Sequence, residues 1–466
     1  MSTFHWLTIG RFKARRDCPF AGQSSEHDGA KQTWLTSIAV LSMIVSMSAN
    51  RRETWVVMAL LASATAASLP TQQVVAKAQA GEDAETSKKP PATTADDPLA
   101  HWRSGVRIRP VSAAPGRHTI HSYYVCNPES PDGRRVLFYV STRANGYSGD
   151  LCILDRVSGQ EKILVRDVSV EDAHRAACQQ WISGGRRVAY HEVRDGRWRV
   201  VVVDAETGMP TVTVDDRQIA FGQPDGDLLP IYGSHWKPGP HRDLELLNAA
   251  TGEVRTVLTA DAVEKRYGTW LKQEFDDKPI SIFFPVLSPD RSRVFFKIAA
   301  GNGGNEFMSK DASHRQGLIS YALERNRFLF LREKWGHPAW HPDSSRIIEM
   351  GNLLLDAVDG SVTRIPNLPN LRGSHPSISP DGRLMVTDGL TDSPGVGGKS
   401  GEWCVMVGDL RGNRHEVLHR FDNTRGAKSW RRSDPHPVFS SDSRRIYFNV
   451  SDGDFTQLFV AEMQSE

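Results

Sequence analysis

The sequence predicts an all-β fold, a seven-bladed β-propeller, and two observations support this prediction. A turn motif built on Ser-Pro-Asp-Gly recurs about every 49 residues between residues 120 and 463. Each copy leads into an alternating strand, then into a strand that runs to Asp and Gly, and then into a closing strand. Four strands in a repeat of this length are typical of a propeller blade. A pair of β-sandwiches or a β-helix would not produce this order of strands and turns.

The composition limits the class of protein. The 466 residues include 57 Lys and Arg against 55 Asp and Glu, so the formal net charge is only +2. A nearly neutral chain without a basic cluster argues against nucleic-acid binding. A hydrophobic content of 39% excludes global disorder. We therefore expect a folded, turn-rich protein. A monomer is expected as well.

The first 97 residues are predicted to lie outside the propeller, which is expected over residues 98–466. Arg51 and Arg52 precede an apolar run, residues 55–67, that ends in small residues. This pattern predicts a secretory signal peptide within an N-terminal extension, residues 1–67, with Met47 a candidate start. The run is shorter than the roughly 20 apolar residues of a membrane span, although an uncleaved anchor remains the alternative. Residues 68–97 have the composition of a disordered linker.

Export would place the mature chain in the periplasm or outside the cell, either free or anchored to the membrane, with no transmembrane domain in the mature chain. The mature chain would retain four cysteines, Cys126, Cys152, Cys178 and Cys404. An oxidising compartment permits a disulfide between two of them, and the sequence does not indicate which pair.

The seven repeats differ in how well they keep the motif. The clearest copies cover residues 337–349, 374–388 and 436–449, weaker ones begin at Ser130 and Ser288, and the most degraded begin at Ser183 and Pro224. In each unit a short apolar inner strand enters the turn, where Pro and Gly suit the tight geometry. Residues 445–450 are an example of the second strand, residues 151–159 of the third and residues 416–419 of the closing strand.

Three histidines occupy the same place in successive repeats. His337, His375 and His436 each precede a proline at the start of an inner strand. Inner strands of a propeller converge on its axis, so we expect the three imidazoles to face one space. Asp434 lies two residues before His436, and on an extended segment both side chains point to the same face. Imidazoles with a carboxylate suit manganese, iron or zinc. The same repetition is also compatible with a structural role inherited with the repeats.

Other polar residues are interpreted as structural. Asp343, Asp381 and Asp442 stand in the turns, where Asp bonds to its own backbone. His341 is expected to be a solvated turn residue, and His235, in a Pro- and Gly-rich loop, to lie at the surface.

The last three repeats resemble those of the oligogalacturonate lyases, seven-bladed propellers related to the TolB-type repeat family that act on unsaturated pectin fragments. The resemblance rests on Gly-His337-x-x-Trp340, on Ser-His375-Pro-Ser377, and on Asp434-Pro-His436-Pro-x-Phe439, together with the spacing between them. It covers residues 336–463 and is faint before them.

The resemblance implies a set of roles. His375 and His436 match metal-ligand positions. Asp434 stands where the family has a histidine ligand, and its carboxylate can also bind a metal. The implied metal is divalent, manganese above all. His337 matches the proposed catalytic base. Arg315 or Arg431 would bind the substrate carboxylate. Apart from the resemblance, Trp430 near the expected channel mouth is a candidate for stacking on a sugar ring, with core packing as the alternative.

Two departures from the family pattern stand out. Arg431 occupies the position of a family glutamine ligand, and residues 297–300, Lys-Ile-Ala-Ala, replace a His-Glu-Gly-Pro segment. Two functions therefore remain open. One is an exported lyase that cleaves uronide oligosaccharides by metal-assisted β-elimination. The other is a non-catalytic TolB-type propeller that binds a protein or glycan in the cell envelope, and bound metal would distinguish the two.

Overall fold

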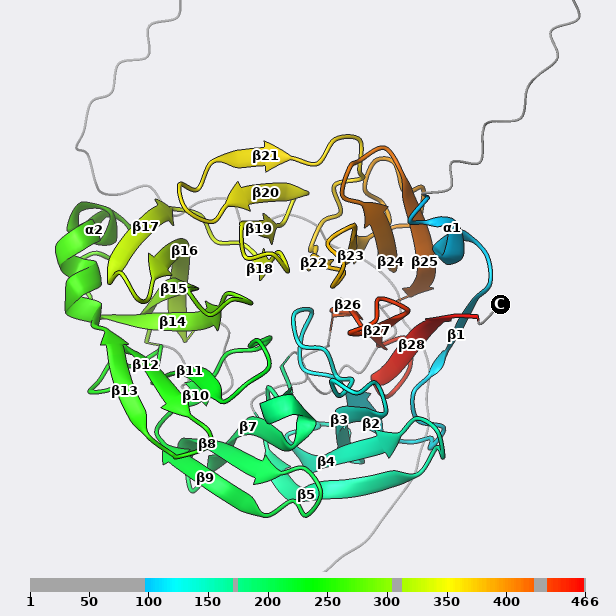
Figure 1. The fold of residues 1–466 in the computed structure, drawn as a ribbon, viewed down its shortest axis with the longest axis horizontal. Coiled ribbons are helices and arrows are strands. Elements are labelled where there is room, and N and C mark those ends of the chain that lie inside the picture. Colours follow the sequence, from blue (N-terminus) through cyan, green and yellow to red (C-terminus); the bar gives the residue numbers. More distant parts are fainter. Residues whose placement is uncertain (1–96, 171–174, 304–311, 423–433, 465–466) are drawn as a thin grey trace, which may run out of the picture. The chain divides into compact units, whose positions relative to one another are not determined.

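The computed structural model describes residues 97–170, 175–303, 312–422 and 434–464. Seven four-stranded antiparallel sheets stand in a ring around a central axis, as Figure 1 shows. The prediction of a seven-bladed β-propeller is therefore confirmed. The expected extension and signal peptide, and the linker up to residue 96, lie outside the described residues. No described helix is long and apolar enough to cross a membrane.

Six blades follow the chain in order, each from an inner strand at the axis to an outer strand at the rim (Figure 1). Blade 1 contains β2 (His118–Ile120), β3 (Arg135–Ser141), β4 (Ser148–Asp155) and β5 (Glu161–Ser169). Blade 2 contains β6 (Gln180–Ile182), β7 (Arg187–Arg194), β8 (Arg197–Asp204) and β9 (Pro210–Asp215). Blade 3 contains β10 (Gln218–Ile219), β11 (Leu228–Tyr232), β12 (Leu244–Asn248) and β13 (Val254–Leu258).

The next three blades carry most of the candidate site. Blade 4 contains β14 (Ile280–Leu287), β15 (Arg293–Gly301), β16 (Ser313–Ala322) and β17 (Arg327–Arg332). Blade 5 contains β18 (Ala339–Trp340), β19 (Arg346–Glu349), β20 (Leu353–Asp356) and β21 (Val362–Arg364). Blade 6 contains β22 (Ser377–Ile378), β23 (Leu384–Leu390), β24 (Glu402–Asp409) and β25 (His415–Asp422).

Blade 7 closes the ring with a strand from the other end of the domain. Its sheet runs from β26 (Val438–Phe439) through β27 (Arg445–Val450) and β28 (Gln457–Met463) to β1 (Val106–Pro110). β1 pairs antiparallel with β28, with Val106 opposite Met463 and Pro110 opposite Phe459. The first and last described strands therefore share one sheet, which the repeat pattern did not predict.

The described helical elements lie at the start of the domain, inside blade 2 and between blades. α1 (Ala100–Arg103) precedes β1, and the short 3₁₀ helix η1 (Ser183–Gly185) forms the degraded turn of blade 2. α2 (Ala260–Phe275) connects blades 3 and 4 and was not predicted. It begins at Thr259, whose hydroxyl accepts a hydrogen bond from the backbone N–H of Ala262. Val263, Trp270 and Phe275 on one face are buried against these blades.

The repeated turns have the structural role predicted for their aspartates. The Asp343 side chain accepts the backbone N–H of Ser345 at 2.8 Å, and Asp442 accepts that of Arg444 at 3.0 Å. Asp381 accepts the N–H of Arg383 in the same way. These bonds stabilise each turn locally. The repetition of the motif is therefore explained by its structural role and requires no functional one.

Two histidine predictions were wrong. His341 belongs to its turn but is buried, because its ring packs beside Asp343, with Nδ1 2.7 Å from the carboxylate, and beside Gly382 of the next blade. His235 is not at the surface either: its ring is buried against Trp236 and Phe283.

The four described cysteines are all buried, and none of them forms a disulfide. Burial raises the pKa of the Cys126 thiol to about 12, so this side chain behaves as a packing residue.

A buried ion pair closes the ring between blades 7 and 1. The Arg445 guanidinium donates from Nε and Nη2 to the two carboxylate oxygens of Glu129, each at 2.8 Å. The hydroxyl of Tyr447 also donates to Glu129, whose side chain is fully buried. Such a carboxylate depends on its partners, because removing them leaves an uncompensated buried charge.

We expect Arg445→Met to lower the free energy of unfolding by about 3–5 kcal/mol, since Glu129 would lose its buried cation. Denaturant unfolding of the two proteins measures this difference. The neighbouring Arg444 is exposed, so Arg444→Met is the matched control and should change stability little. Equal stability of both variants would contradict this role for the pair.

Candidate functional site

Three imidazoles meet at the channel end where the inner strands begin. His337, His375 and His436 each lie two residues before an inner strand, β18, β22 or β26. The rings of His337 and His375 stack with centroids 4.3 Å apart, and those of His375 and His436 meet edge to face at 4.4 Å. All three side chains are buried or nearly so. The repeat positions thus bring together residues that are almost 100 positions apart.

Asp388, on β23, forms hydrogen bonds with two of these histidines. Its Oδ1 accepts the backbone N–H of His375 at 2.8 Å and lies 2.9 Å from the Nδ1 of the same residue. Its Oδ2 accepts the backbone N–H of His436 in the next blade at 2.9 Å. Asp388 is fully buried, so these bonds replace all its contact with water. One carboxylate therefore positions residues of both blades.

The backbone at His436 is unusual. Its φ of 48° lies in the left-handed region, which non-glycine residues seldom adopt. The bond from its N–H to Asp388 fixes this conformation. Residues held in this way are concentrated at functional sites.

The donor atoms fit a metal ion. Ligand atoms of His375, Asp434 and His436 all lie within 4.8 Å of one another. Because the Nδ1–H of His375 is directed to Asp388, its Nε2 presents a lone pair, an arrangement common among metal-binding histidines. Two imidazoles and a carboxylate suit a divalent ion of the manganese, iron or zinc type. The structure thus brings the three predicted ligands into one candidate metal site.

Opposite forces act on the pKa of His375. Burial lowers it, but the negative charge of Asp388, the hydrogen bond to Asp388 and the charge of Asp434 outweigh burial, so that the pKa is raised. A raised pKa means that the surrounding carboxylates stabilise the protonated, cationic form of this imidazole. A site that stabilises a cation on His375 also favours a metal cation next to it.

His337 has the opposite electrostatic environment. Burial and repulsion by His375 and Lys297 hold its pKa well below the ordinary value, while a bond from the ring to the Ser374 carbonyl acts the other way. Nδ1 lies 3.1 Å from that carbonyl, which can only accept, so Nδ1 carries the hydrogen and Nε2 the lone pair. His337 is thus a neutral imidazole near pH 7. This is the form that a proton acceptor needs.

Beside His337 lies a small cavity of about 170 Å³. Its walls combine aromatic rings with three cationic side chains. The lining residues are Tyr123, Tyr124, Arg175, Phe221, Phe283, Phe284, Lys297, Arg315, Trp335 and His337. A cavity of this size accepts one end group of a larger ligand. Its cations favour an acidic group, and its exposed ring, Trp335, offers a flat apolar face.

Arg315, which the sequence placed in the site, is held at the wall of this cavity. Its guanidinium lies 5.2 Å from the ring centroid of Phe283, and its Nε donates to the Ser313 hydroxyl at 2.9 Å. The same hydroxyl is 2.7 Å from Nδ1 of His235. The buried His235 therefore helps to position Arg315.

Lys297, on β15, is the cation most deeply buried in the wall. Its Nζ donates to the carbonyl of Gly336 and lies 3.4 Å from the ring centroid of Trp335. Burial lowers its pKa to about 7; attraction by Glu349 opposes this and repulsion by Arg315 adds to it. Glu349, buried on β19, accepts the backbone N–H of His337. Burial also raises the pKa of Glu349, against the attraction of Lys297.

Two aromatic residues of blade 1 complete the floor of the site. Tyr123 and Tyr124 follow β2, and both are buried in the channel. The Tyr123 ring lies 4.4 Å from His436, and the Tyr124 ring 5.3 Å from His375. The Tyr124 hydroxyl donates to the Pro338 carbonyl at 2.9 Å. The tyrosines thus pack against the imidazoles of two blades.

The structure divides the predicted site residues into two groups. His337, His375, Asp434, His436 and Arg315 surround one end of the channel. Arg431 and Trp430 lie outside the described residues, and their roles stay predictions. Sequence reasoning missed Asp388, Lys297, Glu349 and Arg175. Asp388 and Lys297 could have been noticed as single charged residues within apolar strands.

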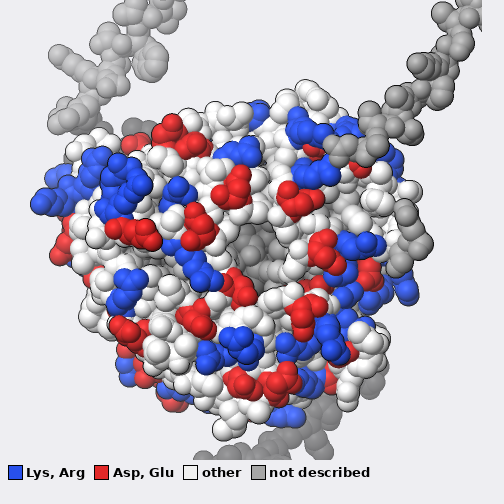
Figure 2. All heavy atoms as spheres, viewed as in Figure 1, with Lys and Arg blue, Asp and Glu red and all other residues white. Residues whose placement is uncertain are grey.

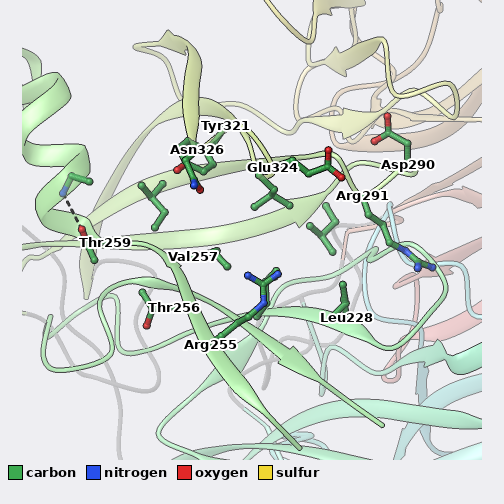
Figure 3. Close-up of a pocket in the computed structure, with 15 residues that line it drawn as sticks. Leu228, Arg255, Thr256, Val257, Thr259, Asp290, Arg291, Tyr321, Glu324 and Asn326 are labelled. Carbon is green, nitrogen blue, oxygen red and sulfur yellow. Dashed lines mark hydrogen bonds between the residues drawn. The ribbon is translucent and has the colours of Figure 1, made fainter. Parts of the chain in front are cut away.

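A larger cavity, of about 880 Å³, lies away from the histidines, between blades 3 and 4 (Figure 3). Arg255 and Leu228 line one side, and Glu324 and Asn326 line another. None of the site residues described above lines it. On the face seen in Figure 2, cationic and anionic side chains are interspersed around a central hollow, and cationic side chains gather at the upper left edge.

We expect Asp388→Asn to lower the pKa of the His375 imidazole in the metal-free protein, because the neighbouring negative charge is lost while burial remains. The loss of imidazolium signal in an NMR pH titration should move to lower pH. Asp392→Asn, in a surface pair with Arg372 on the same blade, is the control and should leave the titration unchanged. An unchanged pKa in Asp388→Asn would show that this carboxylate does not govern His375.

Comparisons with known proteins show a likeness of fold. No family model matches the chain, and no curated protein matches it. The solved structures that resemble it include an oligogalacturonate lyase in complex with manganese, at 16% identity and a TM-score of 0.52. The match covers 77% of this chain and 93% of that one.

A second neighbour is the oligogalacturonate lyase of Vibrio parahaemolyticus, at 17% identity and a TM-score of 0.53, covering 77% of this chain and 94% of that one. TolB from Acinetobacter baumannii matches 62% of this chain and 66% of its own, at 15% identity and a TM-score of 0.35. The solved neighbours of this chain thus include both oligogalacturonate lyases and TolB propellers.

Proposed function

We propose that this protein is a uronide lyase that cleaves acidic oligosaccharides by β-elimination with the help of a divalent metal ion. One observation carries the proposal: a candidate metal site and a neutral imidazole stand beside a cavity lined by cations and aromatic rings. Two solved neighbours of similar fold are oligogalacturonate lyases, one of them with manganese. At such low identity the fold supports only the architecture, and the residues carry the chemistry.

The substrate class follows from the cavity. Arg175, Lys297 and Arg315 place three cationic side chains around a space that admits a single end group. A uronate carboxylate is the matching anion, and Arg315 has the planar fork that binds it in two places. Trp335, 38% exposed, presents a surface on which a sugar ring stacks. We place the acidic end of the oligosaccharide here.

His375, Asp434 and His436 would hold the metal ion, with manganese the first candidate. When bound, the ion would supply positive charge that stabilises negative charge developing on the uronate carboxylate. Asp388 keeps the His375 ring turned so that Nε2 is presented to the site.

His337 is the candidate base. Its Nε2 lone pair takes the proton from the carbon next to the carboxylate. The electron pair of that C–H bond becomes the new carbon–carbon double bond, and the adjacent C–O bond to the leaving sugar breaks. The leaving oxygen keeps the bonding pair and takes up a proton. Nothing is oxidised or reduced, and the product is an unsaturated uronide.

We expect His337→Ala to lower turnover about 10²–10⁴-fold, which is the usual contribution of a positioned base. Ultraviolet absorbance of the unsaturated uronide, with an oligogalacturonide and Mn²⁺, measures this. His101→Ala, at an exposed position on α1, is the control. Unchanged turnover in His337→Ala would remove this residue from the reaction.

The metal is tested separately from activity. We expect purified protein reconstituted with Mn²⁺ to retain about one ion per chain, and His375→Ala to lose it, as read by metal analysis. If the wild-type protein binds no divalent ion, the proposed lyase function is wrong. The alternative function, a non-catalytic propeller that binds a protein or glycan, would then remain.

A further inference from the structure

The proposed reaction still needs a residue that donates a proton to the leaving group. His337 gains a proton, and the leaving oxygen of the sugar must receive one, because a sugar alkoxide is a poor leaving group. The donor has to stand at the same cavity as His337 and has to be protonated near neutral pH. Among the described residues that line this cavity, Lys297 differs from the arginines, since an arginine does not release its proton.

The backbone joins the amine of Lys297 to the imidazole of His337. The peptide bond between Gly336 and His337 accepts a hydrogen bond from Nζ of Lys297 at its carbonyl, and at its N–H it donates to Glu349. Lys297 and Glu349 thus form hydrogen bonds with the carbonyl and the N–H of the peptide unit that precedes His337. A side chain at Gly336 would collide with the Glu349 carboxylate, so this close arrangement requires glycine here.

We propose that Lys297 is the general acid of the reaction, the group that gives a proton to the leaving sugar oxygen. This rests on the proposed function and completes it. The Lys297 ammonium loses one N–H proton to that oxygen as the C–O bond breaks, and becomes a neutral amine. His337 becomes imidazolium by taking the proton from carbon. Solvent then returns a proton to the amine and removes one from the imidazolium, so both groups regain their starting forms.

The surroundings of Lys297 suit an acid of this kind. The Trp335 and Phe284 rings, with centroids 3.4 and 5.5 Å from Nζ, replace water around the ammonium, and only 2% of the residue is exposed. The titratable and charged groups that interact with it come from four neighbouring segments. They are Glu349 on β19, Arg315 on β16, His337 before β18 and His375 before β22. Glu349 retains the proton on the amine, whereas burial and Arg315 favour its release. The opposite roles of His337 and Lys297 follow from these different environments.

The leaving group provides a direct test. A uronide with a sugar leaving group needs the acid, whereas a uronate with 4-nitrophenoxide at the same carbon does not, because nitrophenoxide leaves without a proton. We expect Lys297→Met to lower turnover of the sugar substrate about 10²–10⁴-fold. Turnover of the nitrophenoxide substrate should fall far less, because the variant loses one of three cations around the carboxylate but no acid that this leaving group needs. His337→Ala should be slow on both. Lys272→Met, at an exposed position on α2, is the matched control.

The pH profile provides the second readout. An acid must be protonated to act, and burial brings the pKa of Lys297 to about 7. Wild-type kcat/KM for the sugar substrate should therefore fall as the pH rises through this region. For Lys297→Met acting on the nitrophenoxide substrate, this decline should be absent.

Loss of Lys297 also leaves Glu349 without its cation, which could unfold the protein. The double variant Lys297→Met/Glu349→Gln removes both charges and keeps an oxygen to accept the N–H of His337, so it should fold and show the same dependence on the leaving group. Equal slowing of both substrates in this folded variant, or slowing of neither, would overturn the role of Lys297. If the wild-type protein releases neither leaving group, the proposed function itself is wrong. This outcome is seen before any variant is made.

Discussion

The candidate site depends on the Asp388 carboxylate. Its two oxygens receive backbone N–H groups from His375 and from His436, which belong to different blades, and it also binds the His375 ring. A fully buried carboxylate is costly unless it is fully bonded. The same carboxylate therefore sets the distance between the two blades, the left-handed conformation of His436 and the direction of one imidazole. Without it His375 and His436 would lose the bonds that fix their geometry relative to each other.

A related arrangement operates in blade 5 with a different result. Glu349 accepts the N–H of His337, as Asp388 accepts that of His375. The charge of Glu349, however, acts on Lys297 and not on the imidazole beside it. His375 therefore has its pKa raised, whereas that of His337 is lowered. Equivalent positions in the repeat thus carry imidazoles of opposite character, one suited to lie beside a cation and one suited to accept a proton.

The sequence predicted what is encoded locally. The seven sheets follow from turns that each close through a few residues, and the clustering of His337, His375 and His436 follows from their equivalent places in the repeats. The closing strand β1 was missed, because it is not a copy of the repeat and its partner lies about 350 residues away. α2 was missed because it is an insertion between blades. Asp388 and Lys297 were missed because they lie inside strands, where side-chain direction and neighbouring blades decide their use.

The site lies across the closure of the ring, and this links stability to function. His436 belongs to blade 7 and contacts Tyr123 of blade 1. The same two blades are joined by the pair of Arg445 and Glu129, and blade 7 is completed by β1. A propeller that opened at this seam would separate His436 from the tyrosine floor, while His337 and His375 would still lie in adjacent blades. Weakening the closure should therefore affect both parts of the site. His436 of the candidate metal site would lose its contact with Tyr123, and the same tyrosine, together with Tyr124, lines the cavity around Lys297.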